Sequence, residues 1–235
     1  MNRMKRNISI SEIEKFNEFS IDWWDETGRM KSLHDINPLR LSYIIQKTSL
    51  KGKRVLDVGC GGGILTEKIA QQGAITFGID ASAHMTAIAR SHAQKADLDI
   101  EYIDTDIEHI TQFTNTGFDV ILCMELLEHV PCYKSIILAC RKILNPGGII
   151  IFSTINRNLL SFLLAILIAE YILELLPKGT HEYKSLIKPH ELNRVCSGAG
   201  LKNFDITGFS YNPFTRNYYF CKNSMVNYMA SFKHV

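Results

Sequence analysis

The sequence has almost no net charge, and so lacks the basic excess that capture of a polyanion requires. Its 235 residues include 26 lysines and arginines against 24 aspartates and glutamates, a formal net charge of +2. Nucleic-acid-binding proteins usually need a surplus of basic side chains to neutralise phosphates. We therefore expect no nucleic acid among the partners of this protein.

Clustered cysteines are also lacking. The six cysteines are widely spread and include no C-x-x-C pair, so their spacing does not indicate a disulfide framework. The basic N-terminus is not followed by the apolar run of a secretory signal. These absences predict a cytoplasmic protein with reduced thiols.

No hydrophobic run reaches the roughly 20 clean apolar residues of a membrane-spanning helix. The longest, at 159–176, is interrupted by Glu170 and Glu174 and closed by Pro177. We expect a helix here that does not cross a membrane. From Lys178 onward the chain has eight basic and three acidic residues, a charge of +5, whereas the preceding part has a charge of −3.

The remaining composition, 46% hydrophobic and 21% charged, is typical of a folded protein with a sizeable core. Between Lys51 and Thr154, short apolar runs alternate with helical patterns, as in strand-helix-strand units. Strands are expected at 55–58, 74–80, 100–103, 118–123 and 148–154, and helices at 64–72, 82–95 and 134–144. The pattern predicts an α/β fold with a doubly wound, mostly parallel, seven-stranded sheet.

A cluster of glycines at 59–63 directly follows the first expected strand. Glycines at such a turn let the backbone bend tightly and let a ligand approach it closely. The dinucleotide fingerprint requires glycine where this chain has Ile64, and no Walker lysine follows. Asp80, at the end of the second strand, lies where a carboxylate can accept hydrogen bonds from both hydroxyls of a ribose. The implied ligand is a ribose without a pyrophosphate.

The segment VLDVGCGGG, with GID downstream, resembles the motifs of the class I S-adenosylmethionine-dependent methyltransferases, and the match continues through FDVILCMELLEHV and LNPGGIIIFST. The resemblance implies a Rossmann-like fold and S-adenosylmethionine as methyl donor. An arginine suits a methionine carboxylate because its charge is permanent and it can bond in two places. By matching position, the cofactor-binding residues are Arg40, Gly59, Gly61, Asp80 and Met124.

Segments outside this core are similar to the ubiquinone-biosynthesis O-methyltransferases, namely WWDETGRMKSLHDINPLRLSYI, the stretch from STINRNLL to KPHEL, and YNPFTRNYYF. That family methylates hydroxyl groups of a polyprenylated phenol or catechol at two steps of a pathway. The resemblance implies the same activity and substrate here. It also implies association with other enzymes of the pathway and a peripheral location at the inner membrane.

We expect a single domain made of four parts. These are an N-terminal helical extension (1–50), a cofactor-binding core (51–155), an apolar and basic insertion (156–190) and a C-terminal part of the sheet (191–235). The last part should contain a helix from Pro189 to about Ala199 and strands at 201–207 and 211–220.

The apolar helix at 159–176 allows two interpretations. It could be buried, in the core or in a dimer interface, because a helix that is apolar almost all round can be covered by protein. It could also lie in the membrane interface, with neighbouring basic residues meeting anionic headgroups. Those residues are Arg157, Lys178, Lys184 and Lys188. A polyprenylated substrate favours the second interpretation and predicts binding to anionic membranes.

Methyl transfer to a phenol needs a base or a cation, because a phenol with a pKa of about 10 is mostly neutral at pH 7. Glu125, Glu128 and His129 follow the fourth strand, at the sheet edge where such folds bind ligands. If this segment is helical, the three share one face and could hold Mg²⁺. Alternatively, His129 alone takes the proton, or the two acids merely stabilise a helix N-terminus. His129 and Glu128 are the candidate catalytic residues.

Two other functions remain open. The chain could methylate another small molecule at oxygen or nitrogen on the same fold, or it could be a non-catalytic S-adenosylmethionine-binding scaffold of a lipid-pathway complex. A scaffold would be expected to have lost its glycine loop or Asp80, and both are present. Ile64 disfavours a nicotinamide-dependent dehydrogenase.

Overall fold

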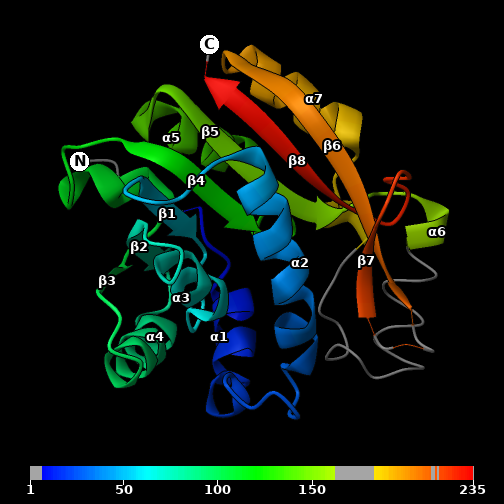
Figure 1. Cartoon of the computed structure of the whole chain (residues 1–235). Coiled ribbons are helices and arrows are strands. Elements are labelled where there is room, and N and C mark those ends of the chain that lie inside the picture. The colour runs from blue at the N-terminus through cyan, green and yellow to red at the C-terminus, as the bar shows by residue number, and fades with distance from the viewer. Residues whose placement is uncertain (1–6, 162–182, 213–214, 216, 235) are drawn as a thin grey trace.

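A mixed β-sheet, whose described part has eight strands, runs through the whole molecule (Figure 1). The structure is a computed structural model that describes residues 7–161, 183–212, 215 and 217–234. The strand order is β3-β2-β1-β4-β5-β8-β6-β7. The strands are β1 (Arg54–Val58), β2 (Ile75–Asp80), β3 (Ile100–Asp104), β4 (Phe118–Met124), β5 (Leu144–Ile155), β6 (Leu201–Asn212), β7 (Asn217–Cys221) and β8 (Asn227–His234).

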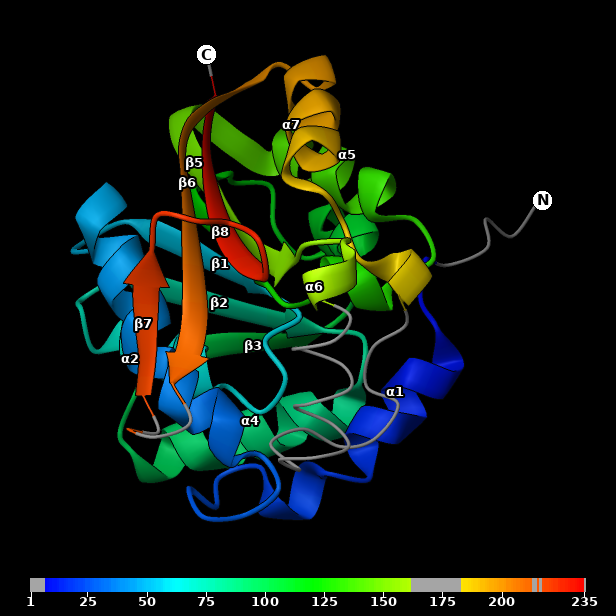
Figure 2. The ribbon, with the colours of Figure 1, turned by 90° about the vertical axis from the view of Figure 1, so that its right-hand side faces the viewer.

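Helices cover both faces of the sheet (Figures 1 and 2). They are α1 (Ile10–Asn17), α2 (Lys31–Lys47), α3 (Ile64–Ala70), α4 (Ala83–Lys95), α5 (Tyr133–Ile143), α6 (Leu159–Ser161) and α7 (Pro189–Gly198). Short 3-10 helices are η1 (Ser20–Asp22), η2 (Ile107–Gln112), η3 (Leu127–His129) and η5 (Tyr183–Ser185). Helices α2, α3 and α4 pack on one face, whereas α5, α7 and η2 pack on the other. The predicted doubly wound α/β fold is confirmed.

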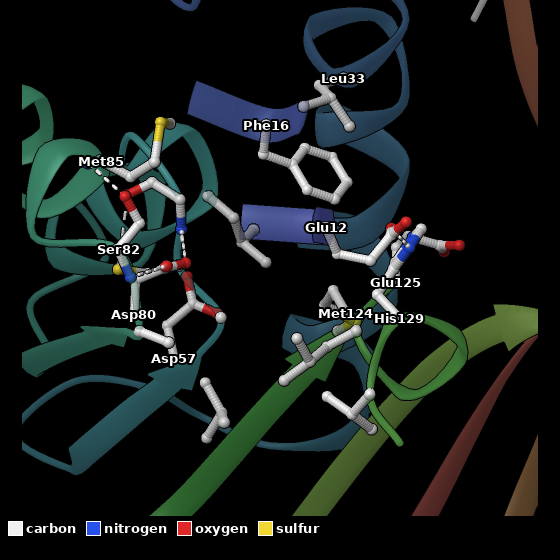
Figure 3. Close-up of a pocket in the computed structure, with 18 of the residues that line it drawn as sticks. Glu12, Phe16, Leu33, Asp57, Asp80, Ser82, Met85, Met124, Glu125 and His129 are labelled. Carbon is white, nitrogen blue, oxygen red and sulfur yellow. Dashed lines mark hydrogen bonds and ion pairs between the residues drawn. The ribbon is translucent and has the colours of Figure 1, made fainter. Parts of the chain in front are cut away.

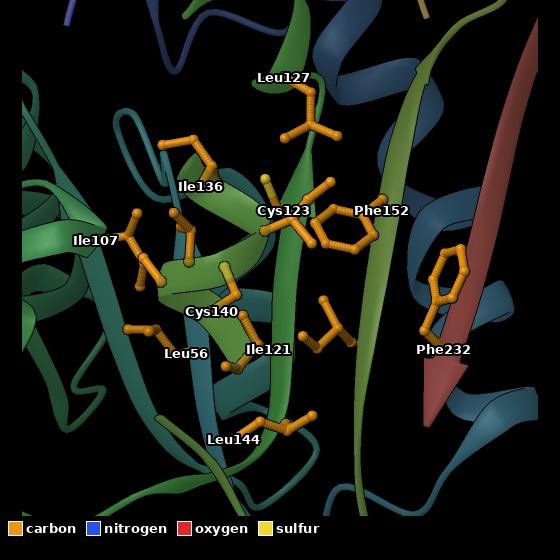
Figure 4. Packing of buried hydrophobic residues seen from close by; sticks show 14 of the residues in the cluster. Leu56, Ile107, Ile121, Cys123, Leu127, Ile136, Cys140, Leu144, Phe152 and Phe232 are labelled. Atoms are coloured by element: carbon orange, nitrogen blue, oxygen red, sulfur yellow. The ribbon is translucent and has the colours of Figure 1, made fainter. Parts of the chain in front are cut away.

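The central parallel strands β1, β4 and β5 are buried on both faces, and their sequences are mostly apolar, as expected for parallel strands covered by helices on both sides. Alternate side chains point to opposite faces, so Val55 joins the core under α2 and α3 while Leu56 joins the core under α5. Figure 4 shows Ile136 and Cys140 of α5 packed towards Cys123 of β4. Because β1, β2 and β4 are parallel, their carboxyl ends lie at one edge of the sheet, and the packing of side chains on both faces holds them there.

The C-terminal strands differ from the prediction of a seven-stranded sheet. The expected strand at 211–220 is wrong, because β6 extends to Asn212 and a separate antiparallel strand, β7, begins at Asn217. Strand β8 was not predicted. It lies antiparallel between β5 and β6, so its side chains are buried on both faces and show no apolar-polar alternation.

The start of β5 also differs. We expected Gly148 as the first residue, but the strand begins at Leu144, with an irregular register between Phe118 and Val120 of the neighbouring β4. The expected helix at 159–176 is described only at α6, and its remainder lies outside the described residues. Among the helices of the described part, none is both long enough and apolar enough to cross a membrane.

Helix α2 is tied to the sheet through one buried tyrosine. The Tyr43 hydroxyl donates to Asp205 Oδ2 of β6 at 2.7 Å and accepts from Ser231 Oγ of β8 at 2.9 Å. The side chain is 1% exposed. Because α2 also carries Arg40, this anchor sets the position of that arginine above the sheet.

A carboxyl group is buried beneath the carboxyl end of β1. Asp57 is 4% exposed and accepts a hydrogen bond from Thr66 Oγ1 of α3 at 2.7 Å. Burial raises its pKa to about 6, although the Thr66 hydrogen bond and the charge of Arg40 partly oppose the rise. The folded protein therefore holds the Asp57 proton more tightly than the unfolded chain does.

Because of this raised pKa, we expect the free energy of unfolding to decrease as the pH rises from about 4 to about 6. Below that window both states are protonated, and within it the unfolded chain loses the proton first, so unfolding becomes easier. Each unit of difference between the folded and unfolded pKa is worth about 1.4 kcal/mol. Over this pH range the wild type should therefore lose up to about 3 kcal/mol more of its free energy of unfolding than Asp57→Asn, which has no carboxyl group to titrate at this position. Urea unfolding from pH 4 to pH 7.5 measures the difference. Parallel curves for the two proteins would contradict the assignment.

Candidate active site

One cavity opens along the carboxyl edge of the parallel strands, with a volume of about 320 Å³. Strands β1 and β4, whose connections leave in opposite directions, meet there, which is where open α/β sheets bind ligands. Figure 3 shows Asp57, Asp80 and Met85 at one end and Met124, Glu125 and His129 at the other. Helices α1 and α2 cover the space between the two ends.

The glycine loop forms one wall of this cavity. Gly59, Gly61 and Gly63 have φ values of +73°, +52° and +90°, in the left-handed region that favours glycine. A Cβ atom on Gly61 would lie 2.6 Å from Trp23 Cζ2, so a side chain there would also displace the indole. The predicted loop is therefore present, and it requires glycine for both its conformation and its packing.

Asp80 fastens the glycine loop to the end of β2. Its carboxylate accepts hydrogen bonds from the backbone N–H of Gly61 at 3.0 Å and of Ser82 at 2.8 Å. Burial raises the pKa of this carboxyl, and the two backbone hydrogen bonds act in the opposite direction. Each carboxylate oxygen retains further acceptor capacity, and Asp80 lines the cavity as the sequence predicts.

Arg40 reaches into the cavity from α2. Its side chain is 8% exposed, and Nη2 lies 3.7 Å from Glu125 Oε1. Two buried donors on the cavity wall, Arg40 Nε and Trp23 Nε1, have no hydrogen-bond partner among the described residues. A buried donor without a partner is costly, so this wall suits a ligand that brings an anionic or polar oxygen.

The far end of the cavity is shaped by an unusual backbone conformation. Glu125 follows β4 with φ at +52°, uncommon for a residue with a side chain. Its backbone N–H donates to the Ser153 carbonyl at 3.0 Å, and its carboxylate accepts from the Ser153 hydroxyl. Met124 lies just before this turn and lines the cavity, as predicted. Such conformations concentrate at functional sites.

The described residues do not support the predicted metal site. The described part of the chain contains no group of three His, Cys, Asp or Glu side chains placed to hold a metal ion. The prediction assumed a helical turn from Glu125, but its positive φ breaks the helix and only Leu127–His129 forms the short η3. Glu125 therefore turns to Ser153, Glu128 to Thr154 and His129 to Glu12.

Glu128 is buried behind the cavity wall. It is 6% exposed, accepts a hydrogen bond from Thr154 Oγ1 at 2.9 Å and is not among the residues that line the cavity. Burial and the neighbouring Glu125 raise its pKa well above the usual range. This geometry does not support the predicted catalytic role for Glu128, because its carboxyl faces Thr154 of β5.

His129 lines the cavity, and its partner is a residue that sequence analysis missed. Its Nδ1 lies 2.7 Å from Glu12 Oε2, on helix α1, and the ring of Phe16 meets the imidazole edge to face at 5.2 Å. The side chain of His129 is 9% exposed. No local pattern links residues 117 positions apart. The sequence predicted only a helical extension over residues 1–50 and no pairing of this segment with the active site.

Comparison with known proteins identifies the family. Residues 33–206 match the family model described as a methyltransferase domain. The ubiquinone biosynthesis O-methyltransferase of Pasteurella multocida (strain Pm70) is 49% identical over 238 residues, covering 97% of this chain and 98% of that protein. The Coxiella burnetii (strain RSA 331 / Henzerling II) protein of the same name is 47% identical over 234 residues and covers 100% of both chains.

Solved structures show the same fold at low sequence identity. Magnesium protoporphyrin IX methyltransferase from Synechocystis PCC 6803, with bound SAH, has a TM-score of 0.69 at 18% identity, covering 94% of each chain. An N-methyltransferase from Bradyrhizobium japonicum WM9 has a TM-score of 0.63 at 18% identity, covering 95% of this chain and 98% of that one. Given these matches, the chain belongs to the ubiquinone biosynthesis O-methyltransferases, S-adenosylmethionine-dependent enzymes built on the class I methyltransferase fold.

Proposed function

We propose that this enzyme transfers the methyl group of S-adenosylmethionine to phenol or catechol hydroxyls of polyprenylated ubiquinone precursors, at both O-methylation steps. The observation that carries the proposal is the single cavity that joins the glycine loop and Asp80 to His129. Methyl transfer is an in-line displacement, so donor and acceptor must be held together in one orientation. A continuous cavity with polar groups at both ends fits that requirement.

The residues proposed to bind the cofactor are those of the glycine loop and Asp80 at one end of the cavity, together with Arg40 and Met124. Bound S-adenosylmethionine supplies an electrophilic methyl group. Asp80 accepts hydrogen bonds from its ribose hydroxyls, and Gly59 and Gly61, which line the cavity, contact its methionine part. Arg40, whose Nε is buried and without a partner among the described residues, pairs with its carboxylate. Met124 packs beside the reacting centre as an adaptable apolar side chain.

His129 is the group that removes the phenol proton. With Nδ1 donating to the Glu12 carboxylate, the imidazole lone pair is on Nε2. Glu125, Glu128 and His129 do not fit a Mg²⁺ site, because His129 pairs with Glu12 of α1 while the two neighbouring carboxyl groups accept hydrogen bonds from hydroxyls of β5. In the proposal His129 is therefore the base, and it lies near the partly buried Glu125 and the buried Glu128.

The proposal is tested with labelled S-adenosylmethionine and a prenylated catechol, followed by analysis of the product. The wild type should place label on oxygen, and His129→Gln should lower kcat by roughly 10² to 10⁴ because it lacks the base. The dissociation constant for S-adenosylhomocysteine should stay unchanged in that variant. His190→Gln, at an exposed position on α7, is the matched control. Absence of label on oxygen with the wild type would refute the proposed function.

Peripheral binding to the cytoplasmic face of the inner membrane extends this proposal, since a polyprenylated substrate is held in the bilayer. The apolar run at 159–176 and the charge of +5 that follows it support this location. Arg157 is paired with Glu191, whereas Lys184 is exposed. Lys184 is therefore a candidate for contact with anionic headgroups, together with Lys178, which lies outside the described residues. The same location would bring the enzyme together with other enzymes that act on this membrane-held substrate.

Co-sedimentation with lipid vesicles tests the membrane proposal. Vesicles containing phosphatidylglycerol should bind the protein more tightly than pure phosphatidylcholine vesicles do. Replacing both Lys178 and Lys184 by glutamate should weaken that binding by at least about 30-fold, at about 1 kcal/mol for each lysine removed. Lys202→Glu, a similar charge change at an exposed position of β6, should have a smaller effect. Equal binding to both kinds of vesicle would exclude the electrostatic contribution.

A further inference from the structure

We propose that Glu12 is a positioning residue of the active site, which binds His129 and sets the tautomer and orientation of its imidazole. This inference rests on the proposed function, in which His129 removes the proton from the acceptor hydroxyl. Glu12 does not contact the reacting atoms in this account. It acts through His129, in the way that a carboxylate orients the histidine of a catalytic triad.

The contacts around His129 restrict the ring on several sides. Glu12 Oε2 lies 2.7 Å from Nδ1, and Phe16, one helical turn later on α1, meets the ring at an interplanar angle of 88°. On the main chain, the N–H of His129 donates to the Leu126 carbonyl at 3.0 Å. Figure 3 shows Glu12 extending from α1 toward His129 across the cavity. Both the ring and its backbone are therefore held.

The charge of Glu12 is suited to this role. Its hydrogen bond with His129 lowers the pKa of the Glu12 carboxyl, outweighing the opposing effect of burial, and Lys15 Nζ lies 3.4 Å from Glu12 Oε1. Glu12 is therefore an anion at neutral pH. An anion at Nδ1 holds the proton there, leaves the lone pair on Nε2 and stabilises the imidazolium that forms when Nε2 takes a proton.

The proposed step moves one proton to His129 and one methyl group to the acceptor oxygen. The acceptor O–H proton passes to Nε2 of His129, and an oxygen lone pair forms the new O–C bond as the C–S bond of the sulfonium breaks. The electrons of that bond remain on sulfur, which becomes a neutral thioether. The imidazolium, paired with Glu12, then releases its proton to water.

Helix α1 is held over the cavity by other contacts, so the role of Glu12 can be separated from that of the helix. Asn7 forms two hydrogen bonds of 2.8 Å with the backbone of Cys132. Asn17 Oδ1 accepts a hydrogen bond from Ser82 Oγ at 2.7 Å. These contacts lie on either side of Glu12 along the chain and do not involve His129. A change at Glu12 should therefore leave α1 in place.

Glu12→Gln tests the inference, because the amide has almost the same shape but no charge and can donate to Nδ1. We expect kcat to fall by about 10- to 100-fold, because the base is still present but is no longer held in position. The dissociation constant for S-adenosylhomocysteine should not change. Glu14→Gln, the same substitution at an exposed position of α1, should retain the wild-type kcat. In a His129→Gln background, Glu12→Gln should cause no further loss. Wild-type kcat in Glu12→Gln, or the same fold-loss in both backgrounds, would overturn the inference.

A second readout does not depend on turnover. Nitrogen-15 NMR of the histidine rings, assigned with His129→Gln, should show His129 protonated at Nδ1 in the wild type and at Nε2 in Glu12→Gln. A wild-type ring protonated only at Nε2 would overturn the inference even in an active enzyme. Loss of O-methyl transfer by the wild type would instead refute the proposed function, and the ring signals would still report the pairing.

Discussion

The hydrogen bond from the Gly61 backbone N–H to Asp80 joins the carboxyl ends of two neighbouring strands, and the shape of the active site depends on it. It holds a loop whose glycines have left-handed conformations against the end of β2. Double burial of the parallel strands keeps both ends in register, because side chains pack on each face of the sheet. In the proposed function this loop and Asp80 bind the cofactor together with Arg40 and Met124, at the end of the cavity away from the methyl acceptor.

The proposed base, His129, lies at the opposite end of the cavity, where the backbone departs from regular structure. The positive φ of Glu125 ends β4 abruptly, and the carboxyl of Glu125 lies next to that of Glu128. Among the described residues these two acids and His129 do not form a group placed to hold a metal ion. Glu125 and Glu128 bond to hydroxyls of β5, whereas His129 pairs with Glu12 of α1. Helix α1 therefore contributes both a cover for the cavity and a partner for the proposed base.

The features that the sequence predicts well are the local ones. The strand-helix alternation, the glycine loop and Asp80 follow from short patterns, because each depends on residues adjacent in the chain. The metal hypothesis assumed a helical turn at Glu125, and the structure does not support it because the backbone there has a positive φ that no residue type signals. Strand β8 was missed because burial on both faces removes the alternation that identifies a strand. The pairing of Glu12 with His129 depends on tertiary packing alone.

The central claim is that cofactor and acceptor bind in one cavity with His129 as the base. A crystal structure with S-adenosylhomocysteine and a short-chain prenylated catechol tests it most directly, because it shows the positions of all three groups together. We expect the ribose hydroxyls to bind Asp80, the methionine carboxylate to bind Arg40, and an acceptor oxygen to lie within hydrogen-bond distance of His129 Nε2 while Nδ1 stays bonded to Glu12. An acceptor ring bound away from His129, or a metal ion between the ring oxygens and Glu125, would contradict it.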